Sequence, residues 1–199
     1  GSLQLAGGLQ QTGSHAVGLV LDIGCGPHCE GARAVRGHGN FRVLGVEVDA
    51  AAAKRAGQEL HGLGSDVILA DMATVRSVLR PGVFDLLLCY YVLQHARSPM
   101  DTLACLKDLV RAERGGIAVA ALGDRSCGGS APLHPFLRSC YRSFLAEDAL
   151  AKSMLHMGCV VHWARTRKKS DETLAEFPCT RVYIVALRSH RRSAHGASV

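Results

Sequence analysis

The chain has 199 residues, of which 48% are hydrophobic and 20% charged, a balance that suits one globular domain and argues against intrinsic disorder. No apolar run approaches the roughly 18 residues that a membrane-spanning helix needs, and the first 20 residues lack the pattern of a secretory signal. We therefore expect a protein of the cytoplasm or the nucleus that is neither membrane-embedded nor secreted.

The net charge of +6 comes from the second half of the chain. Residues 1–100 carry 8 basic and 8 acidic side chains, whereas residues 101–199 carry 15 and 9. Two basic runs, 165–169 and 188–192, belong to this surplus. Basic runs can bind phosphate backbones, so an anionic or nucleic-acid partner is one interpretation. A solvated loop and tail is the other.

The eight cysteines include one close pair, Cys25 and Cys29, with no second close pair after it. Structural zinc sites usually need two such pairs, and a chain of this length can build a core without disulfides. We therefore expect most of these cysteines to be small buried hydrophobic side chains in a reducing compartment, and we expect no metal site.

Short apolar runs alternate with helix-like segments over the first 122 residues. Strands are expected at 18–23, 41–48, 66–70, 83–89 and 117–122, and helices at 50–61, at 72–79 and from Ser98 to the Gly115-Gly116 pair. In the last helix Ser98 is the expected N-cap and Pro99 the first helical residue. This alternation predicts a doubly wound, mostly parallel α/β sheet.

The second half of the chain follows a different pattern. After a long polar loop at 123–143 we expect a helix at 144–157, then strands at 159–164 and 181–187. No helix separates these two strands, so they are expected to form an antiparallel hairpin at a sheet edge. The sequence thus predicts a single domain over 1–188, with a cofactor half at 18–122, an acceptor-side segment at 123–188 and a basic tail at 189–199.

A glycine-rich turn directly follows the first strand, in the run Asp22-Ile23-Gly24-Cys25-Gly26. Glycines there let the backbone turn tightly and approach a ligand closely. Glu47, at the end of the second strand, lies 21 residues after Gly26. An acid at that offset can accept hydrogen bonds from both ribose hydroxyls of a nucleoside. Turn and acid together indicate a nucleoside-binding site.

A dinucleotide site of the nicotinamide oxidoreductases is one alternative. Its Gly-x-Gly-x-x-Gly pattern needs a third glycine for close packing beneath a pyrophosphate. Counted from Gly24, that position is Cys29. This departure counts against a dinucleotide.

Six motifs in order resemble the class I S-adenosylmethionine-dependent methyltransferases, small proteins with a Rossmann-like fold. The resemblance spans about residues 18–187 and rests on Asp22-x-Gly24-x-Gly26, Glu47, Asp71-Met72, the run 84–95, the helix and strand at 106–121, and the closing segment 146–187. It implies S-adenosylmethionine as cofactor and an oxygen or nitrogen methyl acceptor in a small molecule, RNA or protein.

The resemblance also implies roles for individual residues. Glu47 would hold the ribose, and Asp71 with Met72 would contact the adenine. The cofactor-binding set is Asp22, Gly24, Cys25, Gly26, Glu47, Val48, Asp71, Met72 and Tyr90. Tyr91 and Gln94 would face the acceptor, and His95, with Tyr90, is the expected general base. Each of these residues also has a structural interpretation, such as a turn cap or a packed tyrosine.

Two departures from the family pattern matter. His28 stands where the family often has a small residue, and only about 18 residues precede the first strand, so that a cover over the cofactor is missing, truncated or supplied by the 123–143 loop. These departures motivate an alternative, a cofactor-binding or regulatory protein without turnover.

Overall fold

The computed structural model describes residues 17–112, 115–123, 147–168 and 180–188. The predicted loop at 123–143 and the predicted tail at 189–199 therefore lie almost wholly outside the described residues. The elements are β1 (Gly18–Ile23), α1 (Glu30–Arg36), β2 (Phe41–Glu47), α2 (Ala50–His61), β3 (Asp66–Leu69), α3 (Val75–Val78), β4 (Leu86–Tyr90), the 3-10 helix η1 (Leu93–His95), α4 (Pro99–Lys107), β5 (Gly116–Gly123), α6 (Glu147–His156), β6 (Cys159–Lys168) and β7 (Thr180–Arg188).

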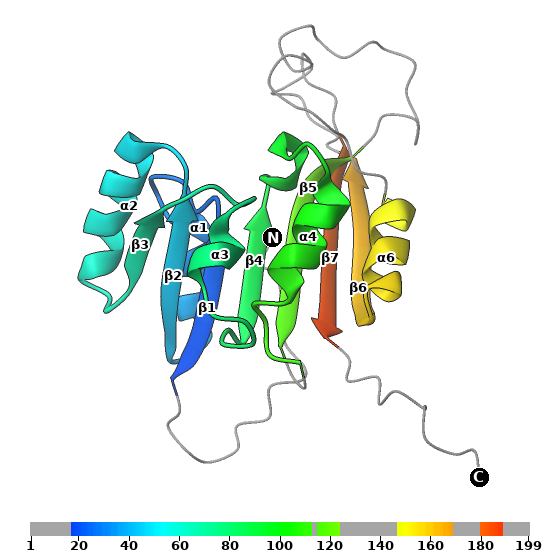
Figure 1. Ribbon diagram of the computed structural model, residues 1–199, viewed down its shortest axis with the longest axis horizontal. Helices are drawn as coiled ribbons and strands as arrows, with labels where there is room; N and C mark the ends of the chain where they lie inside the picture. The colour runs from blue at the N-terminus through cyan, green and yellow to red at the C-terminus, as the bar shows by residue number, and fades with distance from the viewer. Residues whose placement is uncertain (1–16, 113–114, 124–146, 169–179, 189–199) are drawn as a thin grey trace, which may run out of the picture.

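Seven strands form one sheet in the order β3-β2-β1-β4-β5-β7-β6 (Figure 1). The strands β1 to β5 pair in parallel, and this confirms the predicted α/β Rossmann-like architecture. The strand β7 runs antiparallel to both β5 and β6. The segment that joins β6 to β7, residues 169–179, lies outside the described residues.

Alternate residues of the central strands enter two separate cores, as the period of two in a strand requires. Leu21 and Leu87 point into one core together with side chains of α3, α4 and α6. Val20 and Leu88 point into the other, together with side chains of α1 and α2. Figure 1 shows α3 and α4 in front of the sheet. Burial on both faces explains why these strands are nearly continuous apolar runs.

The helices differ from the sequence prediction at three points: α1 was not predicted, α3 begins at Val75 instead of residue 72, and α4 ends at Lys107 instead of at the Gly115-Gly116 pair. Helix α1 lies between β1 and β2, where no helix was predicted, and its N-cap residue Cys29 has φ 49°. In α4, Pro99 occupies the first turn as expected, but the Ser98 hydroxyl bonds the Asp101 carboxylate instead of capping a backbone amide. Asp49 does cap its helix, because its side chain accepts from the Ala52 amide at 2.7 Å.

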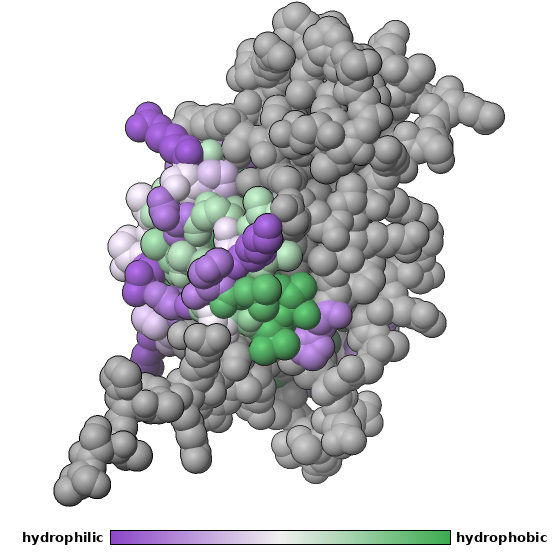
Figure 2. Space-filling view, turned by 90° about the vertical axis from the view of Figure 1, so that its right-hand side faces the viewer, coloured by the Kyte–Doolittle hydropathy of each residue, from purple (hydrophilic) through white to green (hydrophobic). Residues whose placement is uncertain are grey.

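Two large apolar side chains of α6 and β6 are exposed at the far edge of the sheet. Figure 2 shows this side, where α6 and β6 meet, and Leu155 and Val160 are 52% and 47% exposed there. No helix of the described part of the chain is long and apolar enough to cross a membrane.

Candidate cofactor site

The carboxyl ends of β1, β2 and β4 meet at one edge of the sheet, because β1 lies between the other two and pairs in parallel with both. The chain order reverses at this point: β2 and β3 follow on one side of β1, and β4 and β5 on the other. In open α/β sheets, ligands bind beside such a switch point, outside the carboxyl ends of the strands.

Both glycines of the turn after β1 have positive φ, 66° at Gly24 and 61° at Gly26. Their surroundings differ. A Cβ at Gly24 would lie 2.7 Å from Cγ2 of Val92, which follows β4, whereas a Cβ at Gly26 would meet nothing within 4 Å. Gly24 is therefore needed for packing, and Gly26 borders open space that a ligand can enter.

The amides of this turn are already hydrogen-bonded within the protein. The Gly24 and Cys25 amides donate to the Val46 carbonyl at 2.8 and 3.2 Å. The Gly26 amide donates to Glu47 Oε2 at 3.0 Å. A pyrophosphate site needs such amides free to point at the ligand. These contacts thus disfavour an anionic dinucleotide at the turn.

Glu47 ties together the ends of β1 and β2. Its Oε2 accepts from Gly26, and its Oε1 accepts from the Val48 and Asp49 amides at 2.8 and 3.0 Å. A carboxylate has about four lone-pair sites, so three amide bonds leave room for a further donor such as a ribose hydroxyl. The side chain thus fits the ribose role and also has a structural one.

Asp22, the last residue but one of β1, is only 2% exposed. Its Oδ2 has no hydrogen-bond partner within the described structure, and a Cβ at Gly31 of α1 would lie 2.8 Å from that atom. Burial raises the pKa of Asp22 to about 7; the Ala32 amide lowers it in part and Glu47 raises it further. Asp22 is therefore an unusually basic carboxylate beneath the glycine-rich turn.

Asp71 and its neighbour Met72 follow β3 at the same edge of the sheet. Asp71 is exposed, and its Oδ1 accepts from the Ala73 amide at 2.8 Å. The other oxygen can accept from a ligand such as an adenine amino group. Met72 packs at the margin of the core, and Val48 is 67% exposed. These three residues offer one acceptor and an apolar surface.

The residues after β4 form the other side of the site. Tyr90 is half-buried at the end of β4, and burial, with a smaller effect of Asp22, raises the pKa of Tyr90 to about 12. Tyr91 has φ 53° and donates its amide to the Ala120 carbonyl at 2.6 Å. His95 is exposed at the end of η1. The two tyrosines and His95 thus come from one short segment.

Gln94 is buried in the 3-10 helix η1. It is 1% exposed, and its Nε2 donates to the Tyr91 carbonyl at 2.7 Å. Gln94 thus supports the backbone of Tyr91, and its predicted position facing the acceptor stays a prediction.

Other residues have structural roles. Asp85 accepts from the Leu19 amide at 2.9 Å and pairs with Arg111 at 3.2 Å, at the opposite end of the strands. Cys25 and Cys29 are free and buried. Cys29 stands where a dinucleotide motif has its third glycine, and it has a left-handed φ of 49° there.

Two contacts were missed by the sequence analysis. Neither Val92, which packs on Gly24, nor Gly31, which leaves room for Asp22, was singled out. The helix that holds Gly31 was itself not predicted, and Val92 resembles any apolar residue after a strand.

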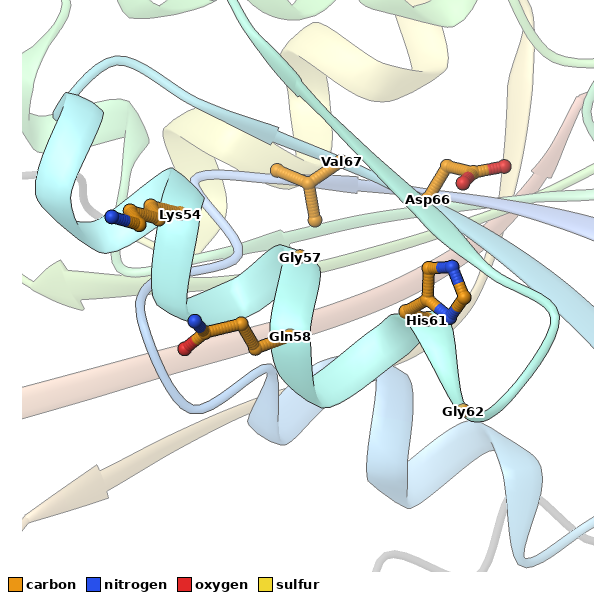
Figure 3. A pocket seen from close by; sticks show the side chains of 7 residues that line it. All are labelled: Lys54, Gly57, Gln58, His61, Gly62, Asp66 and Val67. Carbon is orange, nitrogen blue, oxygen red and sulfur yellow. The ribbon is translucent and has the colours of Figure 1, made fainter.

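A separate hollow of about 620 Å³ lies between α2 and β3 (Figure 3). It is lined by Lys54, Gly57, Gln58, His61, Gly62, Asp66 and Val67. None of these belongs to the cofactor set. No group of three or more His, Cys, Asp or Glu side chains within the described ranges is placed to hold a metal ion.

The fold, the glycine-rich turn and the second-strand acid together define a nucleoside-binding domain of the methyltransferase type. A family model described as "Methyltransferase domain" matches residues 21–120. The chain therefore belongs to this methyltransferase-domain family, whose cofactor is S-adenosylmethionine. No match was found among curated proteins.

Solved structures with the same fold have low sequence identity to the chain. The [4+2]-cyclase SpnF is 12% identical with a TM-score of 0.68, covering 87% of this chain and 76% of its own. A geranyl diphosphate methyltransferase in complex with GPP and sinefungin is 13% identical with a TM-score of 0.69, covering 86% and 72%. An S-adenosylmethionine-dependent methyltransferase from Mesorhizobium loti is 16% identical with a TM-score of 0.67, covering 86% and 92%.

Proposed function

We propose that this chain is an S-adenosylmethionine-dependent methyltransferase that transfers a methyl group to an oxygen or nitrogen acceptor in a small molecule, an RNA or a protein. The proposal includes a single domain over residues 1–188 in the cytoplasm or nucleus. Family membership supports methyl transfer in general, and the site's own contacts support the assignment of residues.

The observation that carries this proposal is the chemistry of the glycine-rich turn. Its three amides at Gly24, Cys25 and Gly26 are bonded to Val46 and Glu47. Two acids, Asp22 and Glu47, lie beside the turn, and neither takes part in an ion pair among the described residues. Such a site favours a cationic nucleoside over an anionic pyrophosphate.

Each cofactor residue then has a physical task. Glu47 accepts from the ribose hydroxyls, Asp71 accepts from the adenine amino group, and Val48 with Met72 gives the ring an apolar contact. Gly26 keeps the space above the turn open, because nothing lies within 4 Å of its Cβ position. Cys25 contributes backbone only, since its thiol lies against Gly45.

When bound, the cofactor supplies an activated methyl group on a sulfonium, so the protein's main tasks are proximity and alignment. Tyr90 and Tyr91 line the end of β4 beside this position. His95 is exposed, and its proposed role is to take a proton from an acceptor that arrives protonated. Gln94 keeps Tyr91 in place through its carbonyl.

The acceptor class is left open by the cofactor residues. The basic runs at 165–169 and 188–192 support an anionic or nucleic-acid acceptor by charge alone. The experiment is a labelled-methyl transfer assay that supplies RNA, protein and small-molecule fractions separately, with Glu47→Ala as the control variant. Label in one fraction, lost in the control, supports the proposal. Cofactor binding without label in any fraction favours the regulatory alternative.

A further inference from the structure

The strand β3 is an end strand of the sheet, and among the described residues it pairs only with β2. The Ala70 amide, just after β3, donates to the Glu47 carbonyl of β2 at 2.9 Å. Backbone groups of successive strand residues point to opposite sides. Ile68 therefore also faces β2, whereas Val67 and Leu69 present their N–H and C=O groups at the outer edge. Such an edge is a template for a further strand.

A hollow of about 620 Å³ lies along this edge, between α2 and β3 (Figure 3). Two of its lining residues are glycines, Gly57 in α2 and Gly62 just after it, and a Cβ at either would meet nothing within 4 Å. Val67 lines the hollow as well, and Leu69 is 61% exposed. The outer edge of β3 thus has free space and an apolar side chain beside its backbone groups.

The hollow has a charge of opposite sign at each end. Lys54 and Asp66 lie at its two ends, with Gln58 between them (Figure 3). Neither Lys54 nor Asp66 takes part in an ion pair among the described residues. A segment that lies along β3 would complement these charges with an acidic side chain at the Lys54 end and a basic one at the Asp66 end.

We propose that the outer edge of β3 binds an extended segment of a partner protein, which adds a strand to the sheet and places an acidic side chain near Lys54 and a basic one near Asp66. In this mode of recognition, main-chain hydrogen bonds give affinity and side-chain contacts give specificity. None of the residues that line the hollow belongs to the cofactor set, so the inference goes beyond the proposed function and does not depend on it.

A second copy of the chain fits this edge less well than a single segment. Figure 1 shows α2 beside β3 at the outer end of the sheet. Two copies joined through their β3 strands would bring both α2 helices together at the junction. An extended segment needs only the hollow and the backbone groups of Val67 and Leu69.

The test is an NMR measurement of amide hydrogen exchange on the full chain, with the synthetic peptide acetyl-Glu-Val-Thr-Val-Lys-amide as the probe. We expect the peptide to slow exchange at Val67 and Leu69 and to leave Ile68, which already faces β2, unchanged. The same peptide with its three central amides N-methylated keeps the side chains but cannot pair with a strand. It should have no effect.

Two variants separate the backbone contribution from the charge contribution. Leu69→Pro removes an outward N–H donor, and Leu69→Ala is its matched control, because it shortens the side chain and keeps the donor. We expect Leu69→Pro to bind the peptide about fivefold more weakly than Leu69→Ala does. Lys54→Glu should weaken binding about threefold, and a peptide with Lys in place of its Glu should restore it.

Three results would overturn the proposal. One is unchanged exchange at Val67 and Leu69 with millimolar peptide, or an equal effect of the N-methylated peptide. Another is protection of both amides in the monomeric chain alone, which would show that the chain itself fills the edge. The third is a dimer in sedimentation that Leu69→Pro dissociates, which would make a second copy the occupant. If Leu69→Pro does not fold, Lys54→Glu decides: equal binding of both peptides to it contradicts the charge complementarity.

Discussion

The backbone amide of Gly26 donates a 3.0 Å hydrogen bond to Oε2 of Glu47, a residue 21 positions later in the chain. This contact joins the turn after β1 to the end of β2. Glu47 therefore has two tasks: it fixes the turn, and it presents its remaining lone pairs at the place where a ribose would lie. A change at Glu47 should affect both folding and cofactor affinity.

Replacement of Glu47 by alanine should weaken S-adenosylmethionine binding by about 1–3 kcal/mol, because the ribose hydroxyls and the Gly26 amide lose their acceptor. Calorimetry at a temperature where the variant is folded measures this loss. The control is Glu59→Ala on α2, whose exposed carboxylate pairs with Arg33 away from the turn. Equal affinities for the two variants would show that Glu47 is misassigned.

The two glycines of the turn should respond differently to alanine. Both substitutions force an L-residue into the left-handed region, at a cost of about 1–2 kcal/mol. Gly24→Ala adds a clash with Val92 at 2.7 Å, so thermal unfolding should show the larger loss of stability there. Gly26→Ala meets open space in the protein, so its main effect should be on cofactor binding. The reverse order of the two effects would contradict this assignment of open space.

Asp85 should matter for stability and not for the cofactor. Asp85→Ala removes the acceptor of the Leu19 amide and the partner of Arg111. We expect a loss of about 1–3 kcal/mol in the free energy of unfolding, measured by urea denaturation. S-adenosylmethionine affinity of the folded variant should match wild type. A loss of S-adenosylmethionine affinity without a loss of stability would show that Asp85 belongs to the cofactor site.

The free energy of unfolding should depend on pH through the raised pKa of Asp22. Its pKa rises from 3.8 in the unfolded chain to about 7 in the folded one, so the folded state binds the proton more tightly. Its contribution to stability is full below about pH 4 and is lost as the pH rises to 7. Relative to wild type, Asp22→Asn should therefore gain stability between pH 4 and pH 8, by on the order of 4 kcal/mol at most. Parallel stability curves for the two proteins would exclude a shifted Asp22.

The sheet, and the cofactor site at the carboxyl ends of its strands, were predictable because their sequence signals are local. Leu21 and Leu87 lie in apolar runs that only a sheet buried on both faces explains, and Glu47 has a fixed offset from Gly26. Helix α1 was missed because it is a short segment, Glu30–Arg36, without a side-chain cap. The burial of Gln94 could not be predicted, since it depends on the left-handed backbone of Tyr91.

The acceptor is less predictable than the cofactor for a chemical reason. A sulfonium methyl group is already activated, so transfer needs alignment more than a fixed set of catalytic side chains. Glu47 and Gly26 meet demands that every acceptor shares. Tyr91 and His95 would meet demands that differ from one acceptor to another. The sequence around these two residues does not show which acceptor it is.

The most direct test of the central claim is a titration of the full chain with S-adenosylmethionine and, separately, with NAD⁺. Because the amides of the glycine-rich turn are bonded to Val46 and Glu47, and because Asp22 and Glu47 have no counter-ion within the described structure, the site should bind the cationic nucleoside. We predict binding of S-adenosylmethionine that Glu47→Ala weakens, and no binding of NAD⁺. Binding of NAD⁺ without binding of S-adenosylmethionine would contradict the account.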